Sequence, residues 1–179
     1  TTLQNDHTIS PRVRKALESA MEQGIAIVPC TGRMKGGIPQ PVRQIKGVRY
    51  CICSNGASVV DLEKDCFLYQ NLIPLALAKQ VLQKIMHYSA SIDVYIDGVA
   101  YNTHACLQNM AMFEKDPFRL EYVLRSRRAV DSLEELLNQT QRDIEKFNIS
   151  FADIGERTRA WEELSRLQGV SITTSIDNG

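Results

Sequence analysis

The chain has 179 residues, of which 44% are hydrophobic and 23% are charged, and its 21 basic residues balance 21 acidic ones. This composition excludes a disordered chain, and the zero formal charge gives no general attraction to nucleic acid or to an anionic membrane surface. We therefore expect neither as a partner, and any anion that the protein binds must be held by a local arrangement of residues.

The sequence contains no apolar run close to the roughly 20 residues that a membrane-spanning helix needs. Its first ten residues, TTLQNDHTIS, have neither the basic start nor the apolar segment of a signal peptide. These observations predict a soluble, cytoplasmic protein. The five cysteines are odd in number and include no C-x-x-C pair, which predicts reduced and mostly buried thiols.

The first predicted helix follows Ser10 and Pro11, which are favourable at the N-cap and at the first helical position. Its apolar residues recur at helical spacing until Gly24 ends the pattern. Residues 25–30, IAIVPC, are too few for a helix, rich in β-branched residues and apolar on both faces, which is typical of a central parallel strand. Glycines and prolines then predict a loop, followed by a short helix at residues 42–45.

The remaining elements are predicted from apolar periodicity and from turn and capping residues. In chain order they are strands at 50–53, 57–61 and 67–70, a helix from residue 74, a hairpin of strands 92–96 and 99–102, a helical stretch at 105–113, a strand at 121–124, a helix at 132–137, a strand at 144–151, a helix after residue 153 and a strand at 170–176. Buried strands thus precede residue 72, whereas alternating strands and helices follow it. The second pattern predicts a mixed or antiparallel sheet with one covered face.

A polar corner, Thr31-Gly32-Arg33, follows the apolar segment 25–30 directly. The carboxyl end of a parallel strand is where open α/β sheets bind ligands, and here it carries a hydroxyl and an unobstructed backbone N–H. Arg33 adds a fork of N–H donors that suits phosphate. Taken alone, the tripeptide favours a plain strand-to-loop turn with a solvated arginine over a phosphate site.

Two longer stretches, NDHTISPRVRKALESAMEQGIAIVPCTGR and CICSNGASVVD, resemble the haloacid dehalogenase (HAD) superfamily, specifically its Cof-type phosphatases. The resemblance implies an α/β fold, with residues 1–72 as a partial Rossmann-like core and residues 73–179 as an inserted α/β cap domain of the C2 type. It also implies an Mg²⁺-dependent phosphatase for small phosphorylated metabolites, such as sugar phosphates, that works through an aspartyl-phosphate.

The same resemblance implies roles for five residues. Thr31 would donate a catalytic hydrogen bond to the transferring phosphoryl group, with the backbone of Gly32 assisting, and Arg33 would lie beside the phosphate or the substrate. Asn55 would lie at the rim of the active site, and Gly56 would let the chain turn there. Donors of this kind suit phosphoryl transfer, which depends on positioning and on neutralising charge.

Two catalytic aspartates that the family carries in its first motif have no counterpart in the sequence, because Thr1 aligns with the threonine that closes that motif. The family's later lysine and acidic Mg²⁺-binding motif would follow Gly179. We therefore expect a chain that is truncated at both ends, holds no metal ligands and is inactive alone. Asp61, Asp97, Asp153 and Asp177 are interpreted as turn or cap residues.

Other interpretations are less favoured. Cys51 and Cys53 would face the same side of a strand and could share a soft metal or form a redox pair, although a zinc site needs about four ligands. The run 125–128, RSRR, could bind phosphate or nucleic acid, but a solvated surface turn is favoured. Tyr95, Tyr101, His104 and Met110 are explained equally by a substrate-facing cap surface and by ordinary packing.

The alternative to an enzyme fragment is a non-catalytic module that binds phosphate or a partner but performs no chemistry. The sequence does not distinguish among substrates, among oligomeric states or among the cap residues that would set specificity.

Overall fold

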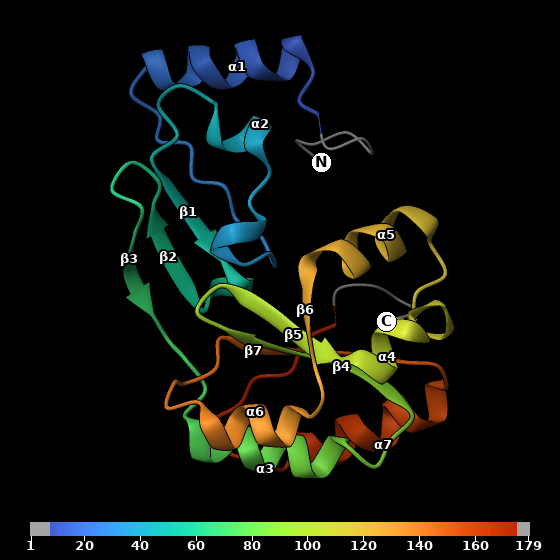
Figure 1. Ribbon diagram of the computed structural model, residues 1–179. Coiled ribbons are helices and arrows are strands. Elements are labelled where there is room, and N and C mark those ends of the chain that lie inside the picture. The colour runs from blue at the N-terminus through green and yellow to red at the C-terminus, as the bar shows by residue number, and fades with distance from the viewer. Residues whose placement is uncertain (1–7, 175–179) are drawn as a thin grey trace. The chain divides into compact units, whose positions relative to one another are not determined.

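The computed structural model describes residues 8–174, and the chain divides into two compact units, unit 1 at residues 1–71 and unit 2 at residues 72–179 (Figure 1). The assignment of these units as a catalytic core and a cap stays a prediction.

Unit 1 combines short helices with a three-stranded sheet. Its elements are α1 (Pro11–Glu22), η1 (Lys35–Gly37), α2 (Gln40–Arg43), β1 (Tyr50–Cys53), η2 (Ser54–Gly56), β2 (Ser58–Asp61) and β3 (Cys66–Gln70). The strands pair antiparallel in the order β1-β2-β3. The first helix is confirmed in detail, since the Ser10 side chain accepts a hydrogen bond from the Val13 N–H at 3.3 Å.

The segment at residues 25–30 differs from its prediction as a buried central strand. Only Cys30 forms a bridge, to Ile52 of β1, and that bridge has the predicted parallel sense. Ile25 and Val28 are 54% and 42% exposed. Pro29 cannot donate to a ladder, and within residues 8–174 the segment has a strand partner at its carboxyl end alone, so Ile25 and Val28 stay uncovered while Ile27 packs in part against the core of unit 1.

The core of unit 1 lies between the helices and the inner face of its sheet. Its buried members are apolar or cysteine side chains: Ile9, Ile38, Val42, Ile45, Val48, Cys51, Cys53 and Val60. Alternate residues of β1 belong to this set because successive side chains of a strand point to opposite faces. The core therefore fixes which face of β1 is inside just before the chain turns at Ser54.

Unit 2 is built from four strands, five α-helices and one 3-10 helix within the described residues. Its elements are α3 (Leu75–Ile85), β4 (Ala90–Ile96), β5 (Val99–Thr103), α4 (His104–Gln108), η3 (Met110–Met112), α5 (Pro117–Ser126), β6 (Arg127–Val130), α6 (Leu133–Gln139), β7 (Lys146–Phe151) and α7 (Ile154–Leu164).

The sheet of unit 2 has the strand order β6-β5-β4-β7. β4 pairs antiparallel with β5 and with β7, whereas β5 and β6 are parallel, so the prediction of a mixed sheet is confirmed. The predicted hairpin is also confirmed: Asp97 and Gly98 turn between β4 and β5 with φ of +49° and +77°. Positive φ at both positions matches the twist of a two-residue hairpin.

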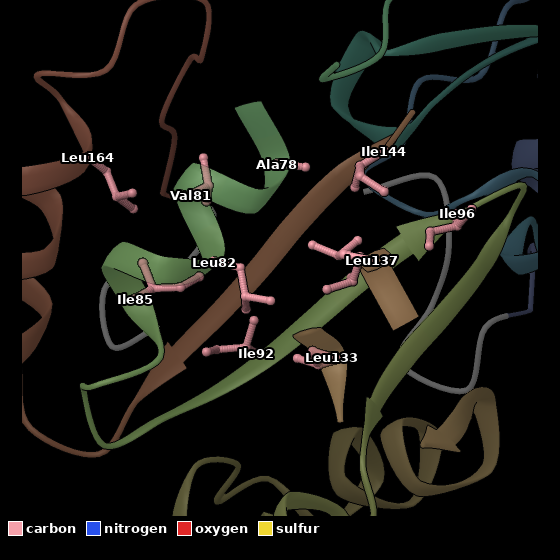
Figure 2. Close-up of a cluster of buried hydrophobic side chains, with 11 residues drawn as sticks. Ala78, Val81, Leu82, Ile85, Ile92, Ile96, Leu133, Leu137, Ile144 and Leu164 are labelled. Carbon is pink, nitrogen blue, oxygen red and sulfur yellow. The ribbon is translucent and has the colours of Figure 1, made fainter. Parts of the chain in front are cut away.

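One face of this sheet is covered by α3, α6 and α7 (Figure 1). Figure 2 shows the side chains that fill the space between them, from α3, β4, α6, Ile144 and Leu164. Along β4, Ile92, Val94 and Ile96 point into this core, so Ser91, Asp93 and Tyr95 point to the opposite face. The sheet therefore has one apolar face and one polar face.

The prediction of a strand at residues 121–124 is wrong, because these residues lie in α5. Asp116 caps that helix by accepting the Arg119 N–H at 2.9 Å, and Pro117 occupies its first position. These helix-start signals outweigh the local strand-like composition. The strand that does occur is β6, which begins at Arg127.

The predicted strand at residues 170–176 is not present over residues 170–174, and its last two residues lie outside the described part. Within residues 8–174, no helix has the length and apolar character required to cross a bilayer.

Candidate functional site

The polar corner at Thr31 is attached to the end of β1 by two backbone hydrogen bonds. The Thr31 N–H donates to the Ile52 carbonyl, and the Ile52 N–H donates to the Pro29 carbonyl, each at 2.9 Å. These bonds run in the parallel sense, so the corner and the end of β1 lie side by side. The corner is therefore held at the carboxyl end of two adjacent strand segments.

A second turn, Ser54-Asn55-Gly56, follows β1 and meets the first. All three residues have positive φ, of +51°, +58° and +100°, so the chain makes a left-handed turn here. The Ser54 N–H donates to the Arg33 carbonyl at 2.8 Å, and the Asn55 N–H donates to the Thr31 carbonyl at 3.3 Å. The two turns are thus joined into one structure, which we call the paired-turn corner, residues 31–33 and 54–56.

Gly32 is required for the close approach of these turns. A Cβ atom at this position would lie 2.4 Å from the Oδ1 atom of Asn55, a separation that real side chains do not tolerate. A side chain at position 32 would therefore displace the end of the Asn55 side chain, and glycine is favoured there for lack of space rather than for an unusual φ. Gly56, in contrast, has room for a side chain but adopts φ of +100°, a conformation that favours glycine.

The Thr31 hydroxyl is oriented by its own turn. Its Oγ1 atom accepts a hydrogen bond from the Arg33 N–H at 3.1 Å, which leaves the hydroxyl proton available to donate elsewhere. Thr31 is half-buried and the neighbouring Gly32 is exposed. The Arg33 guanidinium reaches the Gly37 carbonyl at 3.5 Å. The structure thus brings the five predicted site residues together, whereas their roles toward a substrate stay predictions.

No group of three or more His, Cys, Asp or Glu side chains converges to hold a metal anywhere in residues 8–174. Three of the four aspartates serve turns or caps as predicted: Asp61 accepts the Glu63 and Lys64 N–H groups, Asp97 turns the hairpin and Asp153 caps α7. Asp177 lies outside the described residues. The side chains of this described part therefore do not fit an Mg²⁺ site by themselves.

Asp61 is also paired with Arg49, whose Nε and Nη2 atoms donate to Oδ2 at 3.0 and 2.8 Å. The Asp61 side chain is 1% exposed. The hydrogen bond from Arg49 lowers the pKa of the Asp61 carboxyl, an effect that burial opposes. This ion pair supports β2 at its carboxyl end and lies in the scaffold of the site.

The cysteines only partly follow their prediction. Cys51 and Cys53 are fully buried with their Sγ atoms 3.8 Å apart, and the hydrogen bond between them lowers the pKa of Cys51. Cys30 and Cys66 are exposed, however, because the segments that carry them are not covered. The described residues offer no additional metal ligand beside the buried pair, so they give a soft-metal site no support.

The interpretation of residues 125–128 as a solvated turn is wrong for Arg127. Its side chain is 6% exposed and pairs with Asp93, 4% exposed, through Nε and Nη2 at 3.0 and 2.8 Å from Oδ2. Arg125 and Arg128 are exposed, as that interpretation expected. Parallel pairing of β5 and β6 places Arg127 opposite Ala100, on the polar face of the sheet.

A buried polar network surrounds this ion pair. The Asn102 Nδ2 atom donates to Asp93 Oδ1 at 2.8 Å and to Ser91 Oγ at 3.1 Å. Tyr95 accepts a hydrogen bond from Arg127 Nη2 at 3.0 Å, and burial raises the pKa of its phenol. Sequence reasoning missed Asp93, Asn102 and Arg127, although the alternation of polar and apolar residues along 91–96 was the signal for a polar face.

The four residues weighed as a substrate-facing surface do not share one face. Tyr95 and Met110 are buried at the polar face, where Ser91 contacts the Met110 sulfur at 3.6 Å. Tyr101 packs against the apolar core instead, because neighbouring residues of β5 alternate between faces. The His104 side chain is 60% exposed and lies 4.0 Å from Asp131.

Comparison with known sequences identifies the family to which the chain is similar. The family described as haloacid dehalogenase-like hydrolases matches residues 1–178. The chain is 32% identical over 104 residues to YxeH of Bacillus subtilis, a curated relative whose name carries the word phosphatase. That alignment covers 52% of this chain and 38% of the relative, so the chain spans well under two thirds of its length.

Solved structures share the fold. A haloacid dehalogenase-like hydrolase from B. subtilis superposes with a TM-score of 0.75 at 20% identity, covering 99% of this chain and 68% of that one. TM0651 from Thermotoga maritima gives 0.63 at 22% identity, covering 92% and 57%. The subclass IIB sugar phosphatase BT4131 gives 0.66 at 15% identity, covering 92% and 60%. These likenesses establish the predicted α/β fold class, which both units display.

Proposed function

The chain belongs to the haloacid dehalogenase-like hydrolases, and we propose that the protein of which it forms part hydrolyses small phosphorylated metabolites, such as sugar phosphates. Unit 1 would be the catalytic core and unit 2 the cap. The names of YxeH and of the sugar phosphatase BT4131 support this reaction class. We further propose a soluble, cytoplasmic enzyme.

The observation that carries the proposal is the paired-turn corner. The oxygen of its Thr31 hydroxyl accepts a hydrogen bond from the Arg33 N–H, so the hydroxyl proton stays available to a ligand beyond the turn. A donor fixed in this way needs no reorganisation when negative charge develops on a phosphoryl oxygen, which makes it effective in the transition state. Gly32, next to that donor, is exposed and carries no side chain.

Phosphoryl transfer also requires a nucleophile and a cation, which the family would supply as an aspartate and Mg²⁺. Because the described side chains do not fit a metal site, we derive no step through Mg²⁺ here. We propose that this chain by itself binds phosphate at the corner but does not turn it over.

The experiment is a comparison of Thr31→Ala with Thr31→Ser in the longest natural product of the gene, assayed with a panel of phosphate monoesters. Loss of one transition-state donor should lower kcat by about 10²-fold or more in Thr31→Ala, and the serine should largely restore it. Equal turnover in all three proteins would refute the role of Thr31. Phosphate binding without turnover in the natural product would favour the non-catalytic module.

A further inference from the structure

The buried thiols of Cys51 and Cys53 form a pair that the phosphatase proposal does not use. The two residues lie at alternate positions of β1, so their side chains share the face that packs into the core of unit 1. The Sγ atoms lie 3.8 Å apart, and the Cys53 thiol donates a hydrogen bond to the Cys51 sulfur. The two sulfur atoms are therefore neighbours before any reaction begins.

Ile52, the residue between the two cysteines, makes both hydrogen bonds that attach the Thr31 corner to β1. Its N–H donates to the Pro29 carbonyl, and its carbonyl accepts from the Thr31 N–H, each at 2.9 Å. Ser54, directly after Cys53, begins the second turn of the paired-turn corner. A covalent bond between the two sulfur atoms would therefore span the residue that holds the first turn and end next to the second.

We propose that Cys51 and Cys53 are a redox modification site: a peroxide converts them into a disulfide that loosens the paired-turn corner, and a thiol reductant reverses the change. Formation of the bond does not depend on what the protein hydrolyses. Its regulatory effect rests on the proposed function, because the corner would hold the phosphate-binding hydroxyl of Thr31.

Strand geometry explains why the disulfide would disturb the corner. Alternate Cα atoms of a strand lie about 6.6 Å apart, near the upper end of the roughly 4.4–6.8 Å that a disulfide usually spans. The sulfur atoms must also approach from 3.8 Å to about 2.05 Å. We therefore expect β1 to buckle at Ile52, so that the peptide groups on either side of this residue turn away from Pro29 and Thr31.

The reaction balances with hydrogen peroxide as the oxidant. The hydrogen bond from Cys53 lowers the pKa of Cys51 against the opposing effect of burial, and the Arg43 cation lowers it further. The Cys51 thiolate attacks one peroxide oxygen, the O–O bond breaks, and a sulfenic acid and hydroxide form. The Cys53 thiol then attacks the Cys51 sulfur, and its proton leaves with the hydroxyl group as water. The two thiols and one peroxide thus give one disulfide and two water molecules.

Burial determines which oxidant can act. Both cysteines are 0% exposed, so a bulky oxidant such as glutathione disulfide is excluded. Hydrogen peroxide is close to water in size and can enter when a neighbouring segment opens locally. Residues 25–30 are such a segment, because Ile27 packs against the same core while Ile25 and Val28 are exposed. Within residues 8–174 this segment bridges to β1 only at Cys30, so its opening costs little free energy.

The test is treatment of the native full chain with hydrogen peroxide, followed by alkylation of the remaining thiols in denaturant and digestion with trypsin. Cleavage after Arg49 and Lys64 releases residues 50–64, a peptide that contains Cys51 and Cys53 and no other cysteine. We expect this peptide to escape alkylation and to be lighter by two hydrogen atoms. Dithiothreitol should restore both thiols.

Amide hydrogen exchange measures the effect on the corner without reference to activity. The N–H groups of Thr31 and Ile52 should exchange at least about fivefold faster in the oxidised chain, because each loses a hydrogen bond. Cys30→Ser is the matched control, since Cys30 is exposed and directly precedes Thr31. It should leave the response to peroxide unchanged, whereas Cys53→Ala should abolish it.

Turnover separates this inference from the proposed function. In the longest natural product of the gene, peroxide should lower the turnover of phosphate monoesters about tenfold or more, and dithiothreitol should restore it. Undiminished turnover with the disulfide formed would overturn the regulatory role and leave the proposed function intact. Equal turnover in Thr31→Ala and the wild type would instead refute the proposed function, and the disulfide and exchange results would stand.

Three outcomes would overturn the modification site itself. The first is a peptide 50–64 that keeps both thiols, or that gains oxygen without forming the disulfide. The second is unchanged exchange at Thr31 and Ile52 in the oxidised chain. The third is a response to peroxide that disappears in Cys30→Ser, because the exposed thiol would then be the target.

Discussion

Substitution of Gly32 by alanine tests the packing of the paired-turn corner most directly. The added methyl carbon would lie 2.4 Å from Asn55 Oδ1, which is about 1 Å inside ordinary van der Waals contact. The contact is with the end of the Asn55 side chain, so relieving it requires that side chain to leave its present rotamer, while the backbone of its turn stays held by hydrogen bonds to Thr31 and Arg33. Overpacking of this kind typically costs about 1–3 kcal/mol.

The cost should depend on the Asn55 side chain. In an Asn55→Gly background the clashing atom is gone, while glycine still adopts the native φ of +58° without strain. Gly32→Ala should then cost almost nothing, which gives a coupling energy of at least about 1 kcal/mol between the two positions.

Amide hydrogen exchange of Thr31 and Ser54 is the appropriate assay, since their N–H groups donate to the Ile52 and Arg33 carbonyls and so join the two turns and β1. Gly32→Ala alone should speed their exchange between about fivefold and about a hundredfold, and the double variant should match Asn55→Gly alone. An equal effect of Gly32→Ala in both backgrounds would refute the reasoning, because the cost would then not come from the contact with Asn55.

Three further predictions concern buried polar groups. Asp93→Ala leaves the buried Arg127 guanidinium without its carboxylate partner, so urea denaturation should show that the free energy of unfolding of unit 2 falls by about 3–5 kcal/mol. Adding Arg127→Met should recover part of this loss. Folding lowers the pKa of Asp61 below its unfolded value near 3.8. Ionised Asp61 therefore stabilises the fold fully above about pH 3.8, and this stabilisation is lost as pH falls through the folded pKa. Asp61→Asn should therefore flatten the acid unfolding of unit 1 measured by circular dichroism, and the exposed Asp65→Asn should not. Ser58→Ala removes a buried hydroxyl that has no hydrogen-bond partner, so it should stabilise unit 1 by about 1 kcal/mol in urea denaturation. A loss of stability would show instead that the hydroxyl does have a partner.

Local signals in the sequence predicted the elements well where cap and turn residues marked their ends. Ser10, Ser132 and Asp153 each cap the helix that they were expected to begin. Asp97-Gly98 likewise makes the expected hairpin. These features depend on interactions within a few residues, so a single sequence contains the information needed to place them.

The errors arose where distant residues decide the outcome. Residues 25–30 have the composition of a buried strand, but burial depends on partners that composition does not reveal. Arg127 looked solvated because it lies in a basic run, and its carboxylate partner is 34 positions away. At the candidate site, motif resemblance identified the residues that meet. The close approach of Gly32 to the Asn55 side chain could be found only from the three-dimensional structure.

The strand order of unit 2 has a consequence for the way the unit folds. β4 and β5 are joined by a two-residue turn and can pair early, but β7 pairs with β4 across about 50 to 60 positions of the chain. Long-range pairing of this kind is slow, because the entropy of closing the loop must be lost before any contact compensates for it. The polar face, whose rows draw on β4, β5, β6 and β7, is therefore complete only when β7 has docked, so its assembly marks the end of folding.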